Sequence, residues 1–171
     1  MSKKPANDSI NFKKGDAVVY PAHGVGKIEG IEAYKIGDVE VSLYSIAFDK
    51  DRMRLKIPVQ KAEESGLRAL CSTSRMDDAL TTLQGKAKAK RAMWSRRAQE
   101  YETKILSGDP VLIAEVLKDL YKKEDFDDSS FSEKQIYSSA LDRLARELAA
   151  MQKLDKETAT KKLEEILSEA A

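Results

Sequence analysis

Apolar positions follow two different periods along the chain, the first typical of strands. Before Pro58, short apolar runs alternate with turn residues, and those runs cover residues 17–20, 25–32, 39–48 and 52–57. The last run alternates strictly between basic and apolar residues, as in a strand with one wet and one buried face. Four or five short antiparallel strands over about fifty residues predict a small β-barrel.

After Pro58 the period becomes helical, with apolar side chains three and four residues apart. Helices are predicted from Ser74 to Gly85, from about Lys88 to Leu106, and in three further segments, residues 110–121, 130–151 and 155–167. Expected helix starts are capping boxes at Ser74 with Asp77 and at Ser130 with Glu133, and N-caps at Asp109 and Asp155. Strands followed by helices favour two small domains over one mixed sheet.

Composition excludes several classes of protein. The chain has 171 residues, no stretch long and apolar enough for a membrane span, and no apolar signal segment before residue 12. Its single cysteine, Cys71, fits a reducing cytosol. Since His23 is the only histidine, a catalytic relay or a zinc site would depend on that one residue. We therefore expect no enzyme, no metal and no cofactor, and a cytoplasmic location.

The net charge of +1 is an average over unlike segments. Residues 1–70 hold 12 basic and 10 acidic residues, residues 71–108 hold 8 and 4, and residues 109–171 hold 10 and 15. Between residues 86 and 97 six cations occur without one acid, and they are Lys86, Lys88, Lys90, Arg91, Arg96 and Arg97. One short basic segment could therefore contact nucleic acid although the chain as a whole is nearly neutral.

Two interpretations compete for this basic segment, which also holds the only tryptophan, Trp94. In the first, it is a solvated helix face and Trp94 belongs to the core, because Trp94 shares a helical stripe with Ala98, Tyr101 and Ile105. In the second, cations at a helix start neutralise phosphates, and the tryptophan stacks on a base or wedges into an opened base step. Periodicity alone favours the first.

A second basic feature is the alternating strand with Arg52, Arg54 and Lys56. All three side chains are expected on one side of that strand. They are either the wet face of a barrel or a cationic edge for an acidic protein surface, which could add to another sheet.

Three motifs in this order resemble CarD-like bacterial transcription regulators. They are Phe12-x-x-Gly15-Asp16-x-Val18-Val19-Tyr20-Pro21-x-His23-Gly24-Val25-Gly26, then Leu55-Lys56-Ile57-Pro58, then Trp94-Ser95-Arg96-Arg97 followed by Ser107-Gly108-Asp109. The resemblance covers about residues 12–167. The first motif also occurs in transcription-repair coupling factors, and the Trp-Ser-Arg-Arg segment separates this chain from those.

The resemblance implies an α+β protein of two domains, an N-terminal Tudor/SH3-like small antiparallel β-barrel followed by an all-α domain. Expected boundaries are a flexible N-terminus (1–11), a Tudor-like polymerase-interacting domain (12–62), a linker (63–74) and a helical DNA-contacting domain (75–171). The barrel would dock on the RNA polymerase β subunit. The helical domain would hold the upstream edge of the −10 element, with Trp94 wedged in the minor groove largely independently of sequence, and prolong the open promoter complex.

The site residues follow from the same resemblance. Expected polymerase contacts are Tyr34, Arg52, Arg54, Lys56 and Pro58, and expected DNA contacts are Lys88, Lys90, Arg91, Trp94, Arg96 and Arg97. Three positions depart from the family pattern: Tyr34 replaces a frequent basic residue, Lys56 a frequent arginine and Gln99 an occasional lysine. A monomer is expected. The alternative function is an RNA-binding or ribosome-associated module without polymerase contact.

Overall fold

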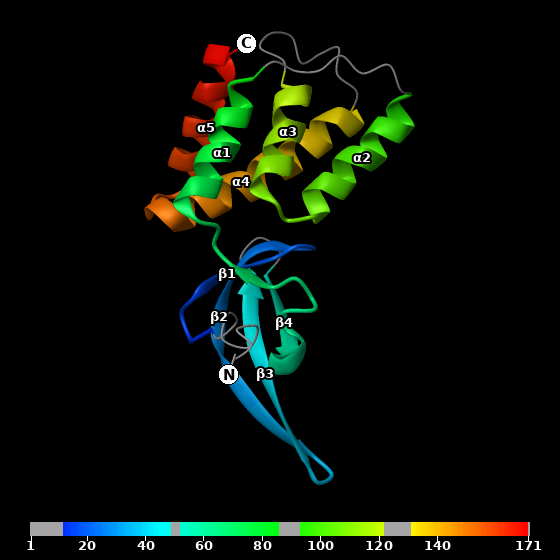
Figure 1. Cartoon of the computed structure of the whole chain (residues 1–171), viewed down its shortest axis with the longest axis vertical. Coiled ribbons are helices and arrows are strands. Elements are labelled where there is room, and N and C mark those ends of the chain that lie inside the picture. The colour runs from blue at the N-terminus through cyan, green and yellow to red at the C-terminus, as the bar shows by residue number, and fades with distance from the viewer. Residues whose placement is uncertain (1–11, 49–51, 86–92, 122–130, 171) are drawn as a thin grey trace, which may run out of the picture. The chain divides into compact units, whose positions relative to one another are not determined.

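The computed structural model describes residues 12–48, 52–85, 93–121 and 131–170. The chain divides into two compact units, one ending at Leu70 and the other starting at Cys71. The first holds the strands and the second the helices (Figure 1). The α+β class expected from the two periods is confirmed.

Five antiparallel strands form the sheet of the first unit. They are β1 (Ala17–Tyr20), β2 (Gly24–Ile36), β3 (Val39–Phe48), β4 (Met53–Pro58) and β5 (Arg68–Ala69), in the spatial order β4-β3-β2-β1-β5. A short 3-10 helix, η2 (Val59–Lys61), follows β4. Since β4 and β5 are the outer strands of this order, the described pairing is that of an open sheet, and closure into a barrel stays a prediction.

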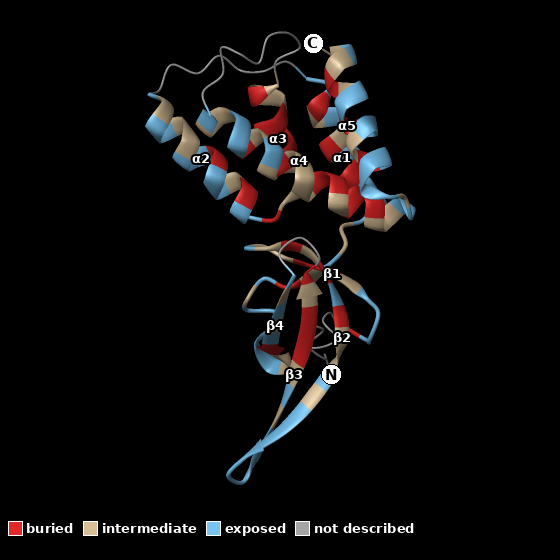
Figure 2. Ribbon diagram, turned by 180° about the vertical axis from the view of Figure 1, so that it is seen from behind, coloured by how far each residue is buried: buried red, intermediate tan, exposed pale blue. Residues whose placement is uncertain are grey.

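A small apolar core explains the sheet. Phe12, Val18, Ile28, Tyr44 and Ile46 are buried on one face, and the Phe12 amide donates to the Tyr44 hydroxyl at 3.2 Å. Apart from Ser45, the buried positions in β1 and β3 are apolar and β-branched or aromatic, the residue types that pack well on a pleated surface. Figure 2 shows this buried core along β3.

β2 and β3 continue as a two-stranded ribbon beyond the rest of the sheet (Figure 1). The ribbon runs from a register shift between Ile28 and Gly30 to the turn at Gly37, whose φ is +64°. A glycine at the first central position with positive φ suits a tight two-residue hairpin. Most side chains of the ribbon are exposed (Figure 2).

The regular structure described in the second unit consists of helices. Its helices are α1 (Thr73–Leu83), α2 (Trp94–Leu106), α3 (Pro110–Leu120), α4 (Phe131–Gln152) and α5 (Lys156–Ala170). α3 lies against α1, α2 and α4, and α4 packs on α5. The apolar stripes read from the sequence meet in one core, including Tyr101, Ile113, Leu117, Leu144 and Leu163.

Helix starts agree with the sequence at two positions. Asp109 caps α3 by accepting from the Val111 amide at 2.9 Å, with Pro110 at the first helical position. Asp155 accepts from the Thr158 amide at 2.7 Å before α5. Both predicted caps are confirmed.

The capping box predicted at Ser74 is wrong. Helix α1 starts two residues earlier, and Ser72 accepts from the Arg75 amide at 3.1 Å. This start places Cys71 and Met76 on either side of the first turn, where both contact the helical core, as in a hydrophobic staple. The second predicted box, at Ser130, lies outside the described residues.

The segment expected as a linker, residues 63–74, holds regular structure in its middle and at its C-terminal end. Leu67 is buried in the core of the sheet, and Val18 and Val19 of β1 pair with the two residues of β5. At the C-terminal end α1 begins at Thr73. The sequence analysis missed β5 because a strand of two residues is too short to show an alternating pattern.

Candidate functional site

The outer face of β4 carries two of the predicted basic residues. Arg54 and Lys56 of β4 are exposed, whereas Ile57 of the same strand faces the core and is buried. The predicted alternation is therefore confirmed for this part of the strand. Arg52 differs, because it lies in the turn before β4 with a φ of +51°. The expectation that all three cations project from one strand is therefore wrong for Arg52.

Strand pairing brings Tyr34 and Lys56 together although they lie 22 positions apart. The Lys56 Nζ donates to the Tyr34 hydroxyl at 3.0 Å and lies 5.4 Å from the centre of the Tyr34 ring. It also pairs with the Glu32 Oε1 at 3.1 Å, and the Tyr34 hydroxyl donates to the same carboxylate. These three side chains form one polar cluster on the sheet surface.

The cluster shifts the titration of its members. The hydrogen bond from Tyr34, followed by that from Lys56, lowers the pKa of the Glu32 carboxyl below its ordinary value. The hydrogen bond with Tyr34, followed by that with Glu32, raises the pKa of the Lys56 ammonium. Both groups are therefore charged at neutral pH, and the tyrosine hydroxyl lies between them.

Arg54 is also paired within the sheet. Its Nε donates to the Glu29 Oε1 at 2.8 Å, while 70% of the arginine side chain is exposed. Exposed pairs of this kind contribute little to stability and exchange partners readily. The strand is thus a row of cations held beside carboxylates of β2, rather than a bare cationic edge.

Apolar side chains extend this surface to the tip of the ribbon. Tyr34 pairs with Val41 and Ile36 with Val39 in the strand register, and Ile36 and Val39 are 69% and 61% exposed. Pro58 pairs with Leu43 farther along the same face. Sequence reasoning missed Glu29, Glu32, Ile36 and Val39. The available signal was the Gly37-Asp38 turn between apolar residues, which predicts a hairpin.

The start of α2 is the second candidate site. Trp94 is its first residue, and the N-cap Met93 is 77% exposed and forms no side-chain capping bond. The first turn holds no acid and two arginines, Arg96 and Arg97. Cations at the positive end of a helix dipole destabilise the helix slightly, so this arrangement suits an external anion.

Trp94 lies at the border of the helical core. It is half-buried, packs against the core cluster, and its ring centre lies 6.1 Å from that of buried Tyr101. The predicted stripe with Ala98, Tyr101 and Ile105 is confirmed. Since Trp94 is only partly buried, the core interpretation holds for part of the side chain, and the nucleic-acid interpretation stays a prediction.

The two arginines behave differently. The Arg97 guanidinium lies 5.5 Å from the Trp94 ring centre and 5.7 Å from that of Tyr101, and its Nη2 donates to the Tyr101 hydroxyl at 3.1 Å. Arg96 is exposed and lines an open depression of about 390 Å³ along α2. Neighbouring arginines of one motif are thus in unlike surroundings.

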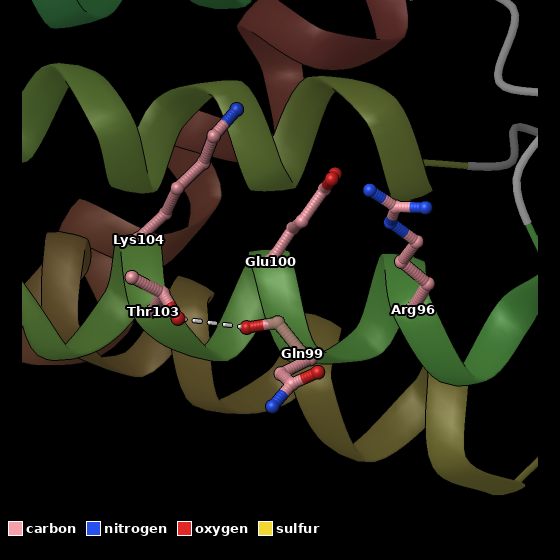
Figure 3. Close-up of a pocket in the computed structure, with 5 residues that line it drawn as sticks. All are labelled: Arg96, Gln99, Glu100, Thr103 and Lys104. Atoms are coloured by element: carbon pink, nitrogen blue, oxygen red, sulfur yellow. Dashed lines mark hydrogen bonds between the residues drawn. The ribbon is translucent and has the colours of Figure 1, made fainter.

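Figure 3 shows Arg96, Glu100 and Lys104 projecting from the same side of α2. Lys104 is paired with Glu115 of α3 at 2.8 Å. The Glu100 carboxylate lies between the two cations along the helix. Within this depression, Lys104 is engaged by Glu115, and exposed Arg96 lies nearer the start of the helix.

Three expected DNA contacts, Lys88, Lys90 and Arg91, lie outside the described residues. Over the ranges that the structure does describe, no set of three His, Cys, Asp or Glu side chains could hold a metal ion. In those same ranges no helix is both long enough and apolar enough to cross a bilayer.

Comparison with known families agrees with this division of the chain. Residues 12–71 match the CarD-like/TRCF RID domain, and residues 78–164 match the CarD C-terminal domain. The two matches cover the sheet and most of the helical unit, and the class they define is that of RNA polymerase-associated transcription regulators. The chain belongs to the CarD-like family of that class.

A curated relative supports the assignment. The chain is 28% identical over 137 residues to "Putative transcription factor YdeB" of Bacillus subtilis (strain 168), a match that covers 80% of this chain and 90% of the relative. The similarity therefore spans both units.

Proposed function

We propose that this chain docks on the RNA polymerase β subunit through the outer face of its sheet and stabilises the open promoter complex through the start of α2. The sheet would be the open form of the Tudor-like barrel expected from the resemblance. The chain would act without catalysis, without a cofactor and as a monomer, wherever the polymerase is found in the cytoplasm.

The observation that carries the DNA role is the position of Trp94. A partly exposed indole at the first residue of a helix has its apolar ring at the end of an element, where it can reach an opened base step. Exposed Arg96 and the N-terminal end of the α2 dipole supply positive charge beside the indole. We infer that the indole contacts the upstream edge of the melted region while Arg96 and cations of residues 88–91 contact phosphates.

The docking role rests on the face of Tyr34, Arg54, Lys56 and Pro58. It combines exchangeable ion pairs with exposed apolar residues at Ile36 and Val39, the mixture found at protein interfaces. Arg52 lies outside β4 and would contribute only charge from the adjoining turn. Docking would bring a weak DNA contact to the promoter at high effective concentration.

Trp94→Ala tests the DNA role. We expect the open-complex lifetime to shorten by roughly 5- to 150-fold, because an aromatic contact with a base contributes about 1–3 kcal/mol. Polymerase binding should stay unchanged, as measured by pull-down, and Trp94→Phe should retain part of the effect. A normal lifetime with correctly folded Trp94→Ala protein would refute the wedge.

Lys56→Glu tests the docking role. The change reverses the charge in the Glu32–Tyr34–Lys56 cluster, so binding to the isolated β subunit should weaken. Lys14→Glu, in the loop before β1, is the charge-matched control and should bind normally. If the two variants bind alike, this face is not the docking surface.

The alternative is an RNA-binding or ribosome-associated module. Affinity purification of the tagged chain from its source cell separates the two functions. Recovery of RNA polymerase supports our proposal, whereas recovery of RNA or ribosomes without polymerase supports the alternative.

A further inference from the structure

Arg97 joins the two aromatic rings at the start of α2. Its guanidinium is within 6 Å of both ring centres, at 5.5 Å from Trp94 and 5.7 Å from Tyr101, and it donates to the Tyr101 hydroxyl. Tyr101 itself is 1% exposed and belongs to the helical core. We call these residues the Trp94–Arg97–Tyr101 stack.

The guanidinium is turned toward the protein rather than toward solvent. The Arg97 Nε is buried and has no hydrogen-bond partner among the described residues, whereas neighbouring Arg96 is exposed. A buried donor without a partner is unfavourable, so attraction to the two ring faces must offset that loss. An arginine that binds a phosphate would instead present its N–H donors to solvent.

From this geometry we propose that Arg97 is a positioning residue: it anchors the indole of Trp94 to the core through Tyr101 and does not bind a phosphate. The effect of this anchoring on promoter DNA rests on the function proposed above. The stack itself is present in the chain without DNA. The division of labour between neighbours is then Arg96 for phosphate and Arg97 for the orientation of Trp94.

A helix end is the place where such an anchor matters. Trp94 is the first residue of α2 and its cap forms no side-chain bond, so the terminal turn is prone to fray. An indole fixed before binding loses less rotamer freedom when it meets the DNA. Lysine would replace arginine only in part, because its ammonium is a compact point charge and lacks the planar guanidinium that can lie against two rings while donating to the Tyr101 hydroxyl.

The single tryptophan makes the stack directly measurable. In the full-length protein without DNA, we expect Arg97→Lys and Arg97→Gln to shift the Trp94 emission to longer wavelength and to increase its quenching by acrylamide. Both changes follow from water reaching the ring face that the guanidinium covers. Tyr101→Phe, which keeps the ring and removes the hydroxyl, should give a smaller shift. Arg96→Lys and Arg96→Gln are the matched controls and should leave the emission unchanged.

Promoter measurements then separate positioning from phosphate binding. With RNA polymerase and a promoter fragment, Arg97→Lys should shorten the open-complex lifetime by about 2- to 10-fold, the range expected from loss of a cation–π contact. In binding to fork-junction DNA, Arg96→Gln should reduce the salt slope by about one unit and Arg97→Gln should leave it unchanged.

Two results would overturn the proposal. One is wild-type emission and quenching in both Arg97 variants, with circular dichroism showing a folded protein. The other is a salt slope reduced by Arg97→Gln and restored by Arg97→Lys, which is the behaviour of a phosphate ligand. A normal lifetime in Trp94→Ala would refute the wedge alone, because the emission of the free protein would still report the stack.

Discussion

Gly26 shows how tightly single residues are specified in the small sheet. A Cβ atom there would lie 2.7 Å from the Phe48 Cε1 and 2.8 Å from the Ile46 Cγ2. Both neighbours are fully buried and belong to the core, so they have little room to retreat. The glycine of the first motif is therefore a packing requirement of the core, and a phosphate loop is not needed to explain it.

Gly26→Ala should lower the free energy of unfolding by about 1–3 kcal/mol, the usual range for overpacking a core. Chemical denaturation monitored by circular dichroism measures the change. Gly30→Ala is the matched control in the same strand, because a Cβ there meets no atom within 4 Å. Equal stability of the two variants would contradict this account of Gly26.

At the residue scale, periodicity predicted the partners of Trp94 but not those of Arg97. Ala98, Tyr101 and Ile105 follow Trp94 at helical spacing, and all contact the core. Arg97, three residues after Trp94, lies about 60° around the helix from Trp94, on the border between core and solvent. The aromatic contacts that hold it depend on side-chain rotamers, which the sequence pattern does not determine.

Asp109 joins two helices besides capping one. One carboxylate oxygen accepts from the Val111 amide at the start of α3, and the other pairs with Arg75 of α1 at 2.6 Å. The cap and the ion pair use different oxygens, so substitution can remove them separately.

Asp109→Ala should destabilise the protein by about 1–2 kcal/mol through loss of the cap. Asp109→Asn keeps an oxygen that can accept from Val111 and loses only the ion pair, which is worth at most about 1 kcal/mol at an exposed site. Thermal denaturation of both variants measures the difference. Asp109→Asn being as unstable as Asp109→Ala would mean that the ion pair, not the cap, dominates.

Asp155 gives the start of α5 a pH dependence. The hydrogen bond with the Thr158 side chain, followed by that with its backbone amide, lowers the pKa of the Asp155 carboxyl below the ordinary value of 3.8. The folded-state pKa is thus the lower one, so the stabilisation is fully present above pH 3.8 and is lost as the pH falls through the folded value.

We therefore expect the stability advantage of wild type over Asp155→Ala to disappear on acidification below pH 3.8. Asp155→Asn keeps the acceptor without titrating and serves as the control. Urea denaturation at a series of pH values measures all three proteins. An advantage that persists to the lowest pH would contradict the cap as its source.

At the element scale, a long and regular hydrophobic pattern predicted the type and the limits of a strand or helix well. Short or ambiguous patterns did not. β3 has the predicted limits because residues 39–48 form one long apolar run between polar turns. The start of α1 was misplaced because Ser72 and Ser74 are equivalent capping candidates locally, and the contact of Cys71 with the core distinguishes them. Arg52 was misassigned because the basic alternation continues into a turn of positive φ.

At the scale of the whole molecule, the two units divide the proposed work between them. The proposed docking face belongs to the unit of residues 1–70, and the proposed DNA contact belongs to the unit of residues 71–171, which also holds the acidic helices. A tether between two weak contacts raises the effective concentration of the second to about millimolar. The chain's net charge near zero is then compatible with a DNA contact.

Cutting the chain between Leu70 and Cys71 should abolish the prolonged open-complex lifetime at concentrations where the intact chain is effective. The mixed fragments must each be folded, as checked by circular dichroism, and the fragment of residues 1–70 should still bind polymerase. A mixture as potent as the intact chain would show that the tether contributes nothing.

The ion pairs on the sheet have a consequence for how the complex comes apart. Arg54 and Lys56 already lie beside Glu29 and Glu32, so the proposed docking on an acidic surface would exchange one carboxylate for another and would release few ions. The proposed phosphate contact by Arg96 would displace condensed cations from the DNA, so its affinity would fall steeply with salt. Rising ionic strength should therefore detach the chain from the promoter first and leave it bound to the polymerase, ready for the next initiation.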